Sequence, residues 1–331
     1  MPKLETRTIR LRCFQSYNAV GPFSSRVTPI SDPEIIIHTI YGDFPGPTLY
    51  VGGCMHGDEL NGTTAILQIL QIIQCYVLRG TVVVVPIQSP VAFNFRERLN
   101  PFDPIDPDWV FPGREVGTYS QVLKYNLLSL SSTADCVIDC HSAGRGGANV
   151  PMVYCPPENG NKCGDKSLEL AISFGGERIV FGDVDGDYDW PVQHTLPFVA
   201  VREGRMGIYT EAGTGGSCIP EKRYVRYFVN GIVNVMKAMN MVTGVILEQG
   251  ERAVVHPRRR EVHVVATREG ISLPVVEVGC SVSTGDCVAE VWDYSGQCCR
   301  LLSPISGLVV YYNRFGSVGS GDRLATISPH L

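Results

Sequence analysis

Apolar residues in roughly the first 245 positions follow two recurring patterns. Short apolar or β-branched runs predict strands at 34–40, 48–52, 81–87, 135–140 and 206–210. Apolar residues at helical spacing predict helices at 60–76, 119–130, 168–174 and 224–239. The runs at 81–87 and 135–140 are continuously apolar or nearly so, which indicates strands buried on both faces. Strands that alternate with helices predict an α/β fold, a sheet with helices on both faces.

Residues 252–331 follow a different pattern. Frequent glycines separate short alternating runs such as 262–266 and 307–312, and no segment has a convincing helical pattern. This pattern predicts a small all-β domain. We therefore expect a larger domain over residues 1–249 and an all-β domain over residues 250–331. Upstream, residues 88–117 are rich in proline and aspartate and are predicted to form one long loop.

Composition narrows the classes of function. The chain has 331 residues, of which 44% are hydrophobic and 18% charged, as expected of a soluble globular protein with a large core. Its net charge is −5 and its basic run 258–260 is short, so we expect no nucleic-acid partner. No apolar run reaches the ~18 residues that span a bilayer, and residues 1–20 lack a secretory apolar centre. We therefore expect no membrane association and a cytoplasmic location.

The 12 cysteines do not form a recognisable metal or redox motif, because no two of them are separated by two residues. In a reducing compartment we expect thiols rather than disulfides. Several cysteines, including Cys75, Cys136 and Cys140, lie in apolar stretches and are interpreted as small buried hydrophobes.

Three polar segments lie at the carboxyl ends of predicted strands. The first carries His56 and Glu59, three residues apart at a strand-to-helix junction, the second carries His141, and the third carries Glu211. Functional sites of open α/β sheets lie beyond the carboxyl ends of the strands, so we expect these side chains to meet. Each segment alone also fits a structural alternative: a solvated turn, a core histidine, or a helix-capping or surface acid.

Together the three segments have the chemistry of a metal-dependent hydrolase. His56, Glu59 and His141 would give two imidazole nitrogens and a carboxylate oxygen, which leaves the fourth position of a Zn²⁺ ion open. An open position is typical of catalytic zinc, whereas structural zinc usually has four protein ligands. Glu211 suits a general base that takes a proton from water, and Asp139 is placed to orient an imidazole from behind.

The order of these motifs resembles the succinylglutamate desuccinylase/aspartoacylase family. The motifs that carry the resemblance are His56–Glu59, Phe111–Gly113, Asp139–Ser142 and Thr210–Gly213. The resemblance spans residues 45–240 and implies the zinc-carboxypeptidase-like fold, a mixed sheet flanked by helices. The β-rich tail is similar to the small second domain, of the barrel-sandwich-hybrid type, that many members carry.

The resemblance also implies roles for individual residues. It makes His56, Glu59 and His141 the ligands of one Zn²⁺ ion per chain. Glu211 becomes the general base and, later, the acid that protonates the leaving nitrogen. An arginine that polarises the scissile carbonyl is expected as well. Arg98 fits the spacing of that arginine best.

Other substrate-binding residues are less determined by the resemblance. Arg96 is the alternative to Arg98, and either arginine also fits an ordinary surface position. Where relatives have an asparagine and an arginine that grip a substrate carboxylate, this chain has Asp108 and Trp109, which suit a cationic or apolar group. Arg145, in a glycine-rich loop, either supplies an anion contact from another direction or faces solvent.

We therefore predict a zinc-dependent hydrolase that cleaves an amide bond in a small N-acylated amino acid or amine. The alternatives are a carboxypeptidase, an esterase or lactonase with the same machinery, and a metal-binding protein without catalysis. Loss of the carboxylate-gripping pair argues against the carboxypeptidase, and retention of Glu211 with the predicted ligands argues against the inactive protein. The expected partner is a small-molecule substrate, and the sequence leaves open whether the chain forms a homo-oligomer.

Overall fold

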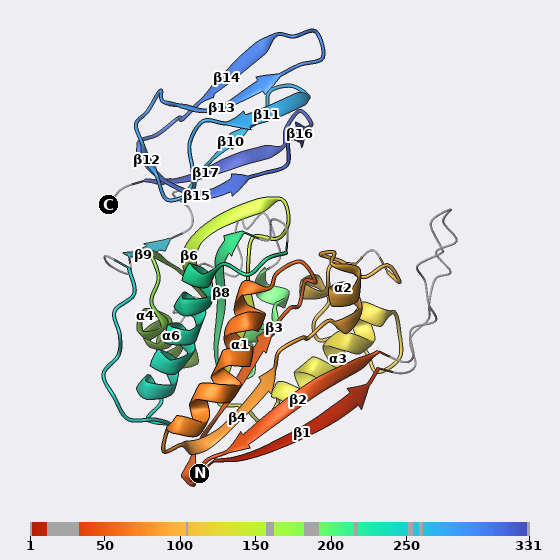
Figure 1. Cartoon of the computed structure of the whole chain (residues 1–331), viewed down its shortest axis with the longest axis vertical. Helices are drawn as coiled ribbons and strands as arrows, with labels where there is room; N and C mark the ends of the chain where they lie inside the picture. Colours follow the sequence, from red (N-terminus) through yellow and green to blue (C-terminus); the bar gives the residue numbers. More distant parts are fainter. Residues whose placement is uncertain are drawn as a thin grey trace.

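The fold is built around one large mixed sheet that runs through both parts of the chain. The computed structural model describes residues 2–11, 33–103, 105–156, 162–181, 192–214, 218–250, 254–257 and 261–329. Within these residues, a 13-stranded sheet forms the centre of the molecule and a 4-stranded sheet lies in the C-terminal part (Figure 1).

Parallel strands form the middle of the large sheet. β3 (Phe44–Gly53) pairs in parallel with β4 (Arg79–Val85) and with β5 (Cys136–His141). β5 in turn pairs in parallel with β8 (Met206–Thr214). Their apolar residues fill both faces: Ile138 belongs to the core on one side and its neighbour Val137 to the core on the other. The carboxyl ends of β3, β5 and β8 therefore meet at one edge of the fold.

Further strands, including β9 from beyond residue 249, extend this sheet on both sides. Towards the N-terminus, β2 pairs antiparallel with both β1 and β4. On the other side, β6 runs antiparallel to β8, and β7 and β9 continue from β6 in parallel. The bounds are β1 (Lys3–Arg10), β2 (Glu34–Tyr41), β6 (Gly147–Cys155), β7 (Arg178–Phe181) and β9 (Val254–Pro257).

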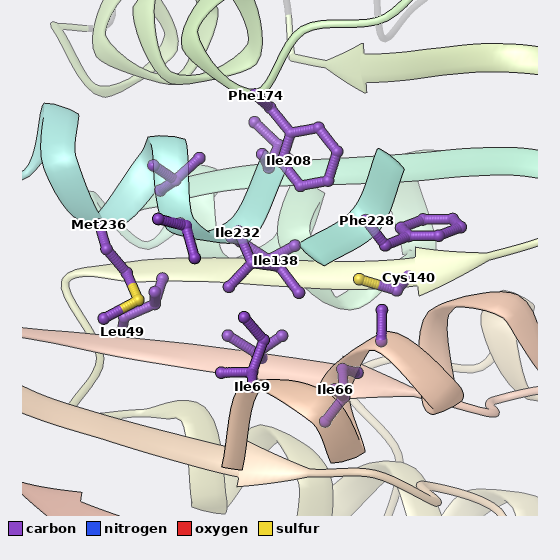
Figure 2. Close-up of a cluster of buried hydrophobic side chains, with 14 of the residues drawn as sticks. Leu49, Ile66, Ile69, Ile138, Cys140, Phe174, Ile208, Phe228, Ile232 and Met236 are labelled. Carbon is purple, nitrogen blue, oxygen red and sulfur yellow. The ribbon is translucent and has the colours of Figure 1, made fainter. Parts of the chain in front are cut away.

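Helices cover both faces of the central strands, as the sequence predicts. One core contains side chains from α1, α4 and α6, with Ile66, Ile69, Phe174 and Ile232 packed against the sheet (Figure 2). The core on the opposite face contains side chains from α2, α3 and α5. The bounds are α1 (Asn61–Ile72), α2 (Pro90–Phe95), α3 (Tyr119–Ser131), α4 (Lys162–Phe174), α5 (Leu196–Arg202) and α6 (Lys222–Ala238). Short 3₁₀ turns are η2 (Ile73–Cys75), η3 (Pro107–Trp109) and η4 (Val192–His194).

The C-terminal part is all β in the residues described, as the sequence predicts. β15 (Gly307–Asn313) pairs antiparallel with β6, so strands of the C-terminal part continue the large sheet of the larger domain (Figure 1). A separate core lies between these strands and the four-stranded sheet. The other strands are β10 (Val262–Val265), β11 (Gly270–Pro274), β12 (Ser281–Val282), β13 (Cys287–Trp292), β14 (Cys298–Leu302), β16 (Ser317–Val318) and β17 (Arg323–Pro329).

The sequence missed several elements. The patterns gave no indication of β1, β6, β7 or α5, and the predicted long loop over 88–117 contains α2 and η3. The expectation for Cys75 was wrong, because its side chain is exposed at the end of η2, whereas Cys136 and Cys140 are buried. None of the described helices is both long enough and apolar enough to cross a membrane.

Candidate metal centre and active site

The turn between β3 and α1 is shaped to present His56 and Glu59. Cys54 begins it with a φ of 52°, which is rare for a non-glycine residue. Gly57 follows His56 and packs directly against the backbone of Ala92. A Cβ on Gly57 would lie 1.9 Å from the carbonyl oxygen of Ala92. The turn therefore accepts only glycine at this position. It buries the side chains of His56 and Glu59 at the carboxyl end of the sheet.

His141 and Glu211 are brought together by the register of two parallel strands. They are direct Cα partners in the pairing of β5 with β8. His141 is the last residue of β5, and its ring stacks on Tyr209 with the ring centroids 4.2 Å apart. The three polar segments expected to meet at strand ends therefore lie together in the fold.

The two histidines converge on the carboxylate of Glu59. The Nδ1 atom of His56 lies 3.0 Å from Glu59 Oε1, and the Nδ1 atom of His141 lies 3.0 Å from Glu59 Oε2. The backbone N–H of Ser142 also donates to Glu59 Oε2 at 3.0 Å. Two imidazole nitrogens and a carboxylate therefore share one buried location.

Carboxylates also lie on the opposite side of both imidazole rings. His56 Nε2 is 3.0 Å from Asp106 Oδ1, and His141 Nε2 is 3.4 Å from Asp139 Oδ2. Asp139 is itself held by the side-chain amide of Gln88, which donates to it at 2.6 Å. Carboxylates in this position orient an imidazole and fix which ring nitrogen carries the proton.

Asp108 is buried behind the histidines and paired with a lysine. Its Oδ2 atom lies 3.7 Å from His56 Nε2 and 3.8 Å from His141 Nε2. Its other oxygen accepts a hydrogen bond at 3.1 Å from Lys124, which is fully buried and also lies over the ring of Phe111. Burial lowers the pKa of Lys124, and Asp108 opposes that shift.

Each pair of imidazole nitrogens offers a separate position for a metal ion. On the Nε2 side, His56, Asp108 and His141 each have a ligand atom within 4.8 Å of the others. On the Nδ1 side the third group is Glu59, which contacts both rings more closely. Lys124 already offsets the charge of Asp108, and the Nδ1 side adjoins the cavity through Ser142. The two histidines could therefore hold a metal ion together with Asp108 or together with Glu59, and both sets contain donor types that Zn²⁺ accepts.

The charges of this cluster depend on one another. Burial and Arg98 both disfavour a charged His56, but Glu59 and Asp106 outweigh them and raise its pKa to about 9. Burial alone would raise the pKa of Glu59, yet the adjacent histidines hold it well below its usual range. Without a metal ion, the raised pKa values favour a proton on each imidazole beside the anionic Glu59, and a bound cation would have to replace a proton on each ring.

The predicted arginines occupy different surroundings. Arg98 reaches the centre of the site, where its guanidinium donates to Glu59 Oε1 at 3.0 Å and contacts Asp106 at 2.9 Å. Arg96 caps α2 with a left-handed backbone, and its carbonyl oxygen accepts a hydrogen bond from Arg145. The Arg145 guanidinium also pairs with Glu97 at 3.1 Å, outside the cavity lining.

Glu211 lies across the cavity with its own hydrogen-bond donors. Asn149 of β6 donates to Glu211 Oε2 at 2.6 Å, and the hydroxyl of Tyr209 lies 3.5 Å from Oε1. Burial, together with the negative charge of Glu59, raises the pKa of Glu211 to about 7. A carboxyl group with a pKa near neutrality can both accept and return a proton.

A cavity of about 510 Å³ opens beside these residues. Its volume lies within the range of small-molecule sites. Arg98, Trp109, Ser142 and Glu211 line it from the larger domain, whereas Asp108 and Arg145 do not. The opposite wall comes from the C-terminal domain and includes Glu261, His263, Val310, Tyr311, Arg323 and Thr326.

Sequence reasoning missed several of these residues. Asp106 and Lys124 carry no local signal, because their partners lie 50 and 16 residues away in the chain. Asn149 lies on β6, a strand that the patterns did not reveal. The cavity wall from the C-terminal domain could be found only once the pairing of β15 with β6 was known.

Comparison with known proteins identifies relatives that match most of the chain. N-alpha-acetyl-L-2,4-diaminobutyric acid deacetylase from Halomonas elongata is 26% identical over 314 residues, which cover 91% of this chain and 89% of that protein. The crystal structure of succinylglutamate desuccinylase/aspartoacylase from Rhodobacter sphaeroides is 26% identical, with a TM-score of 0.80, and the match covers 97% and 95% of the two chains. The product-bound ectoine utilization protein EutE from Ruegeria pomeroyi, 22% identical over 90% and 89% of the chains, shares the fold with a TM-score of 0.79.

The family to which the chain belongs is shown by a match within the larger domain. The sequence profile of the succinylglutamate desuccinylase/aspartoacylase catalytic domain matches residues 45–238, which is more than half of the chain and includes His56, Glu59, His141 and Glu211. The protein therefore belongs to the succinylglutamate desuccinylase/aspartoacylase family.

Proposed function

We propose that this protein is a zinc-dependent hydrolase that cleaves the amide bond of a small N-acylated amino acid or amine. The observation that carries the proposal is the convergence of His56 Nδ1 and His141 Nδ1 on Glu59. Arg98 and Ser142 both donate to Glu59 and line the same cavity as Glu211. The family supports amide hydrolysis, and the donor set supports zinc.

His56, Glu59 and His141 would hold the ion. A Zn²⁺ ion bound there would supply positive charge that polarises an acyl oxygen and makes a water molecule more acidic. Asp106 and Asp139 favour a proton on Nε2 of each ring, so that the Nδ1 lone pairs point towards the ion.

Glu211 would move the proton. Its carboxylate takes a proton from the attacking water and later gives it to the nitrogen that leaves. Asn149 fixes the carboxylate through Oε2, so that Oε1 is the oxygen that exchanges the proton. A pKa of about 7 leaves the group near half-ionised at neutral pH, which suits both steps.

Arg98 would stabilise the negative charge that develops on the acyl oxygen. Its guanidinium lines the cavity beside Glu59, and its pKa is raised above its usual range by Asp106 and Glu59, against the opposing effect of burial. A positive charge that is fixed in place before the reaction needs no reorganisation when the negative charge develops. The two carboxylates hold it in place before substrate arrives.

The substrate class follows from the size of the cavity and from the relatives. The relative from Halomonas elongata is a deacetylase of N-alpha-acetyl-L-2,4-diaminobutyric acid, a small N-acylated amino acid. A cavity of about 510 Å³ accommodates a molecule of this size but not a folded protein chain. An acetylated or otherwise acylated amino acid is therefore the first substrate to test.

The test measures acyl release from a panel of N-acyl amino acids and N-acyl amines, by protein stripped of metal and then supplied with Zn²⁺. We expect turnover only with the ion. Glu211→Gln should bind the same amount of zinc and lower kcat by about 10²- to 10⁴-fold, the usual contribution of a general base. Turnover that survives both metal removal and Glu211→Gln would contradict the proposal.

A further inference from the structure

The residues that replace the carboxylate grip of relatives do not provide one here. Asp108 is buried and paired with Lys124, and Trp109, which lines the cavity with 48% of its surface exposed, has no positive charge. Arg145 points to Glu97, away from the cavity. If the substrate carries a carboxylate, its cationic partner must come from elsewhere in the wall.

Arg323 of the C-terminal domain is a cation in that wall. It is the first residue of β17, and its guanidinium lies over the ring of Tyr311, 4.3 Å from the ring centroid. Both side chains line the same cavity as Glu211. A guanidinium stacked on an aromatic ring keeps its N–H groups directed outward in its own plane, which is the geometry that a carboxylate requires.

A continuous set of contacts joins Arg323 to the catalytic carboxylate. Tyr311 on β15 is the Cα partner of Asn149 on β6, and Asn149 donates to Glu211. From β8 to β17, the strand that carries Arg323, there are three strand spacings, or roughly 15 Å. A substrate of a few carbon–carbon bonds, together with the length of the arginine side chain, covers this distance.

Arg98 and Arg323 lie in different parts of the cavity wall. Arg98 contacts Glu59 and Asp106 of the larger domain, which places it beside the proposed metal ligands and suits it to the reacting acyl group. Arg323 lies in the C-terminal wall, where a more distant charge of the substrate would be met.

We propose that Arg323, held over Tyr311, binds a carboxylate of the substrate and thereby makes the C-terminal domain a determinant of specificity. This inference rests on the proposed amide hydrolysis for its substrate class. The carboxylate belongs either to the amino-acid half or to the acyl half of the substrate, as in a succinyl group. Both sources present the same planar anion to the guanidinium.

The test compares kcat/KM for three substrates that share one amine skeleton: an N-acetyl amino acid, the N-succinyl derivative of the decarboxylated amine, and its N-acetyl derivative, which has no carboxylate. Arg323→Met should lower kcat/KM by about 10- to 100-fold for one of the carboxylates and leave the neutral substrate nearly unchanged. The substrate whose kcat/KM falls shows whether the bound carboxylate belongs to the amino-acid half or to the acyl half. Arg323→Lys keeps the positive charge but not the planar pair of N–H donors, so it should recover part of the lost kcat/KM.

The matched control is Arg300→Met, which removes the same charge from an arginine on β14 whose side chain is 66% exposed. It should leave all three values unchanged. An equal loss on the three substrates with Arg323→Met would indicate a structural role and overturn the inference. No loss on any of them would overturn it as well.

A binding measurement separates this inference from the proposed function. Calorimetry on Glu211→Gln, with and without Arg323→Met, measures the affinity for the same three compounds without turnover. One outcome is that wild-type protein cleaves none of the compounds while Arg323→Met lowers the affinity for a carboxylate-containing compound at least ten-fold. In that case the proposed hydrolysis fails and Arg323 keeps its role. Equal affinity of the two variants for every compound, or no measurable binding at all, overturns the role of Arg323.

Discussion

The two walls of the cavity are built in different ways. Behind the wall of the larger domain, His56, Glu59 and His141 are almost completely buried and are linked to further charged residues by short contacts. On the side of the C-terminal domain, Tyr311 and Arg323 are half-buried on antiparallel strands. The proposed metal ligands are therefore held by burial and charge pairing, whereas the residues that we propose select the substrate lie on a more exposed surface.

Histidines from the two walls provide the largest expected contrast. His141→Ala removes a predicted ligand and should lower zinc affinity by more than the ~10- to 100-fold that loss of an orienting partner costs, with loss of turnover. His263→Ala removes a cavity histidine of the C-terminal domain and should leave zinc content unchanged. Metal analysis after dialysis measures both. Equal zinc content in the two variants would remove His141 from the ligand set.

The next largest difference is expected in the contribution of ion pairs to stability in the two domains. Lys124→Met leaves Asp108 buried without its partner and should reduce the free energy of unfolding by about 3–5 kcal/mol. The pair of Arg268 with Asp293 in the C-terminal domain is partly exposed, so Arg268→Met should cost less than about 1 kcal/mol. Urea denaturation measures both values.

Addition of Asp108→Asn to Lys124→Met serves as the control. It removes the unpaired charge and should recover much of the stability. If Lys124→Met reduces the free energy of unfolding no more than Arg268→Met does, the buried pair stabilises the fold no more than the exposed pair.

The raised pKa of Glu211 predicts a pH-dependent stability of the metal-free protein. Burial raises this pKa to about 7, above its value in the unfolded chain, so the folded state binds more protons between about pH 4.5 and 7. Stability therefore falls as pH rises through this window. Glu211→Gln lacks the effect and should be more stable than wild type above pH 7, by roughly 1–3 kcal/mol. Melting curves at pH 5 and pH 8 test this, and a constant difference between them would contradict it.

The contact between the two domains should give the smallest effect. The loop after His141 meets the C-terminal domain at Gly146, whose carbonyl oxygen accepts a hydrogen bond from the backbone N–H of Arg314 at 2.6 Å. A Cβ on Gly146 would lie 1.9 Å from the ring of Phe315, so Gly146→Ala must displace that ring and should cost about 1 kcal/mol. Gly316→Ala, where a Cβ meets nothing within 4 Å, is the matched control and should be neutral. Equal melting temperatures for both variants would show that this contact does not hold the domains together.

Much of the larger domain could be predicted from local patterns. The run at 81–87 predicted a strand buried on both faces, and β4 has Val82 and Val84 in one core and Val85 in the other. The patterns failed for β6, whose burial comes from its neighbours β8 and β15 rather than from its own sequence. A strand in the interior of a mixed sheet has no polar–apolar alternation to reveal it, and Pro151 interrupts the apolar run of β6.

The sequence by itself determined the family and the set of side chains that reach the carboxyl ends of β3, β5 and β8. It could do so because the motifs are short and lie directly after strands whose apolar runs are recognisable. Only the tertiary structure decided which distant partners surround them: Asp106 behind His56, Lys124 on Asp108, and Arg323 across the cavity. These contacts join residues far apart in the chain, and their energy depends on burial and distance, which no local pattern encodes.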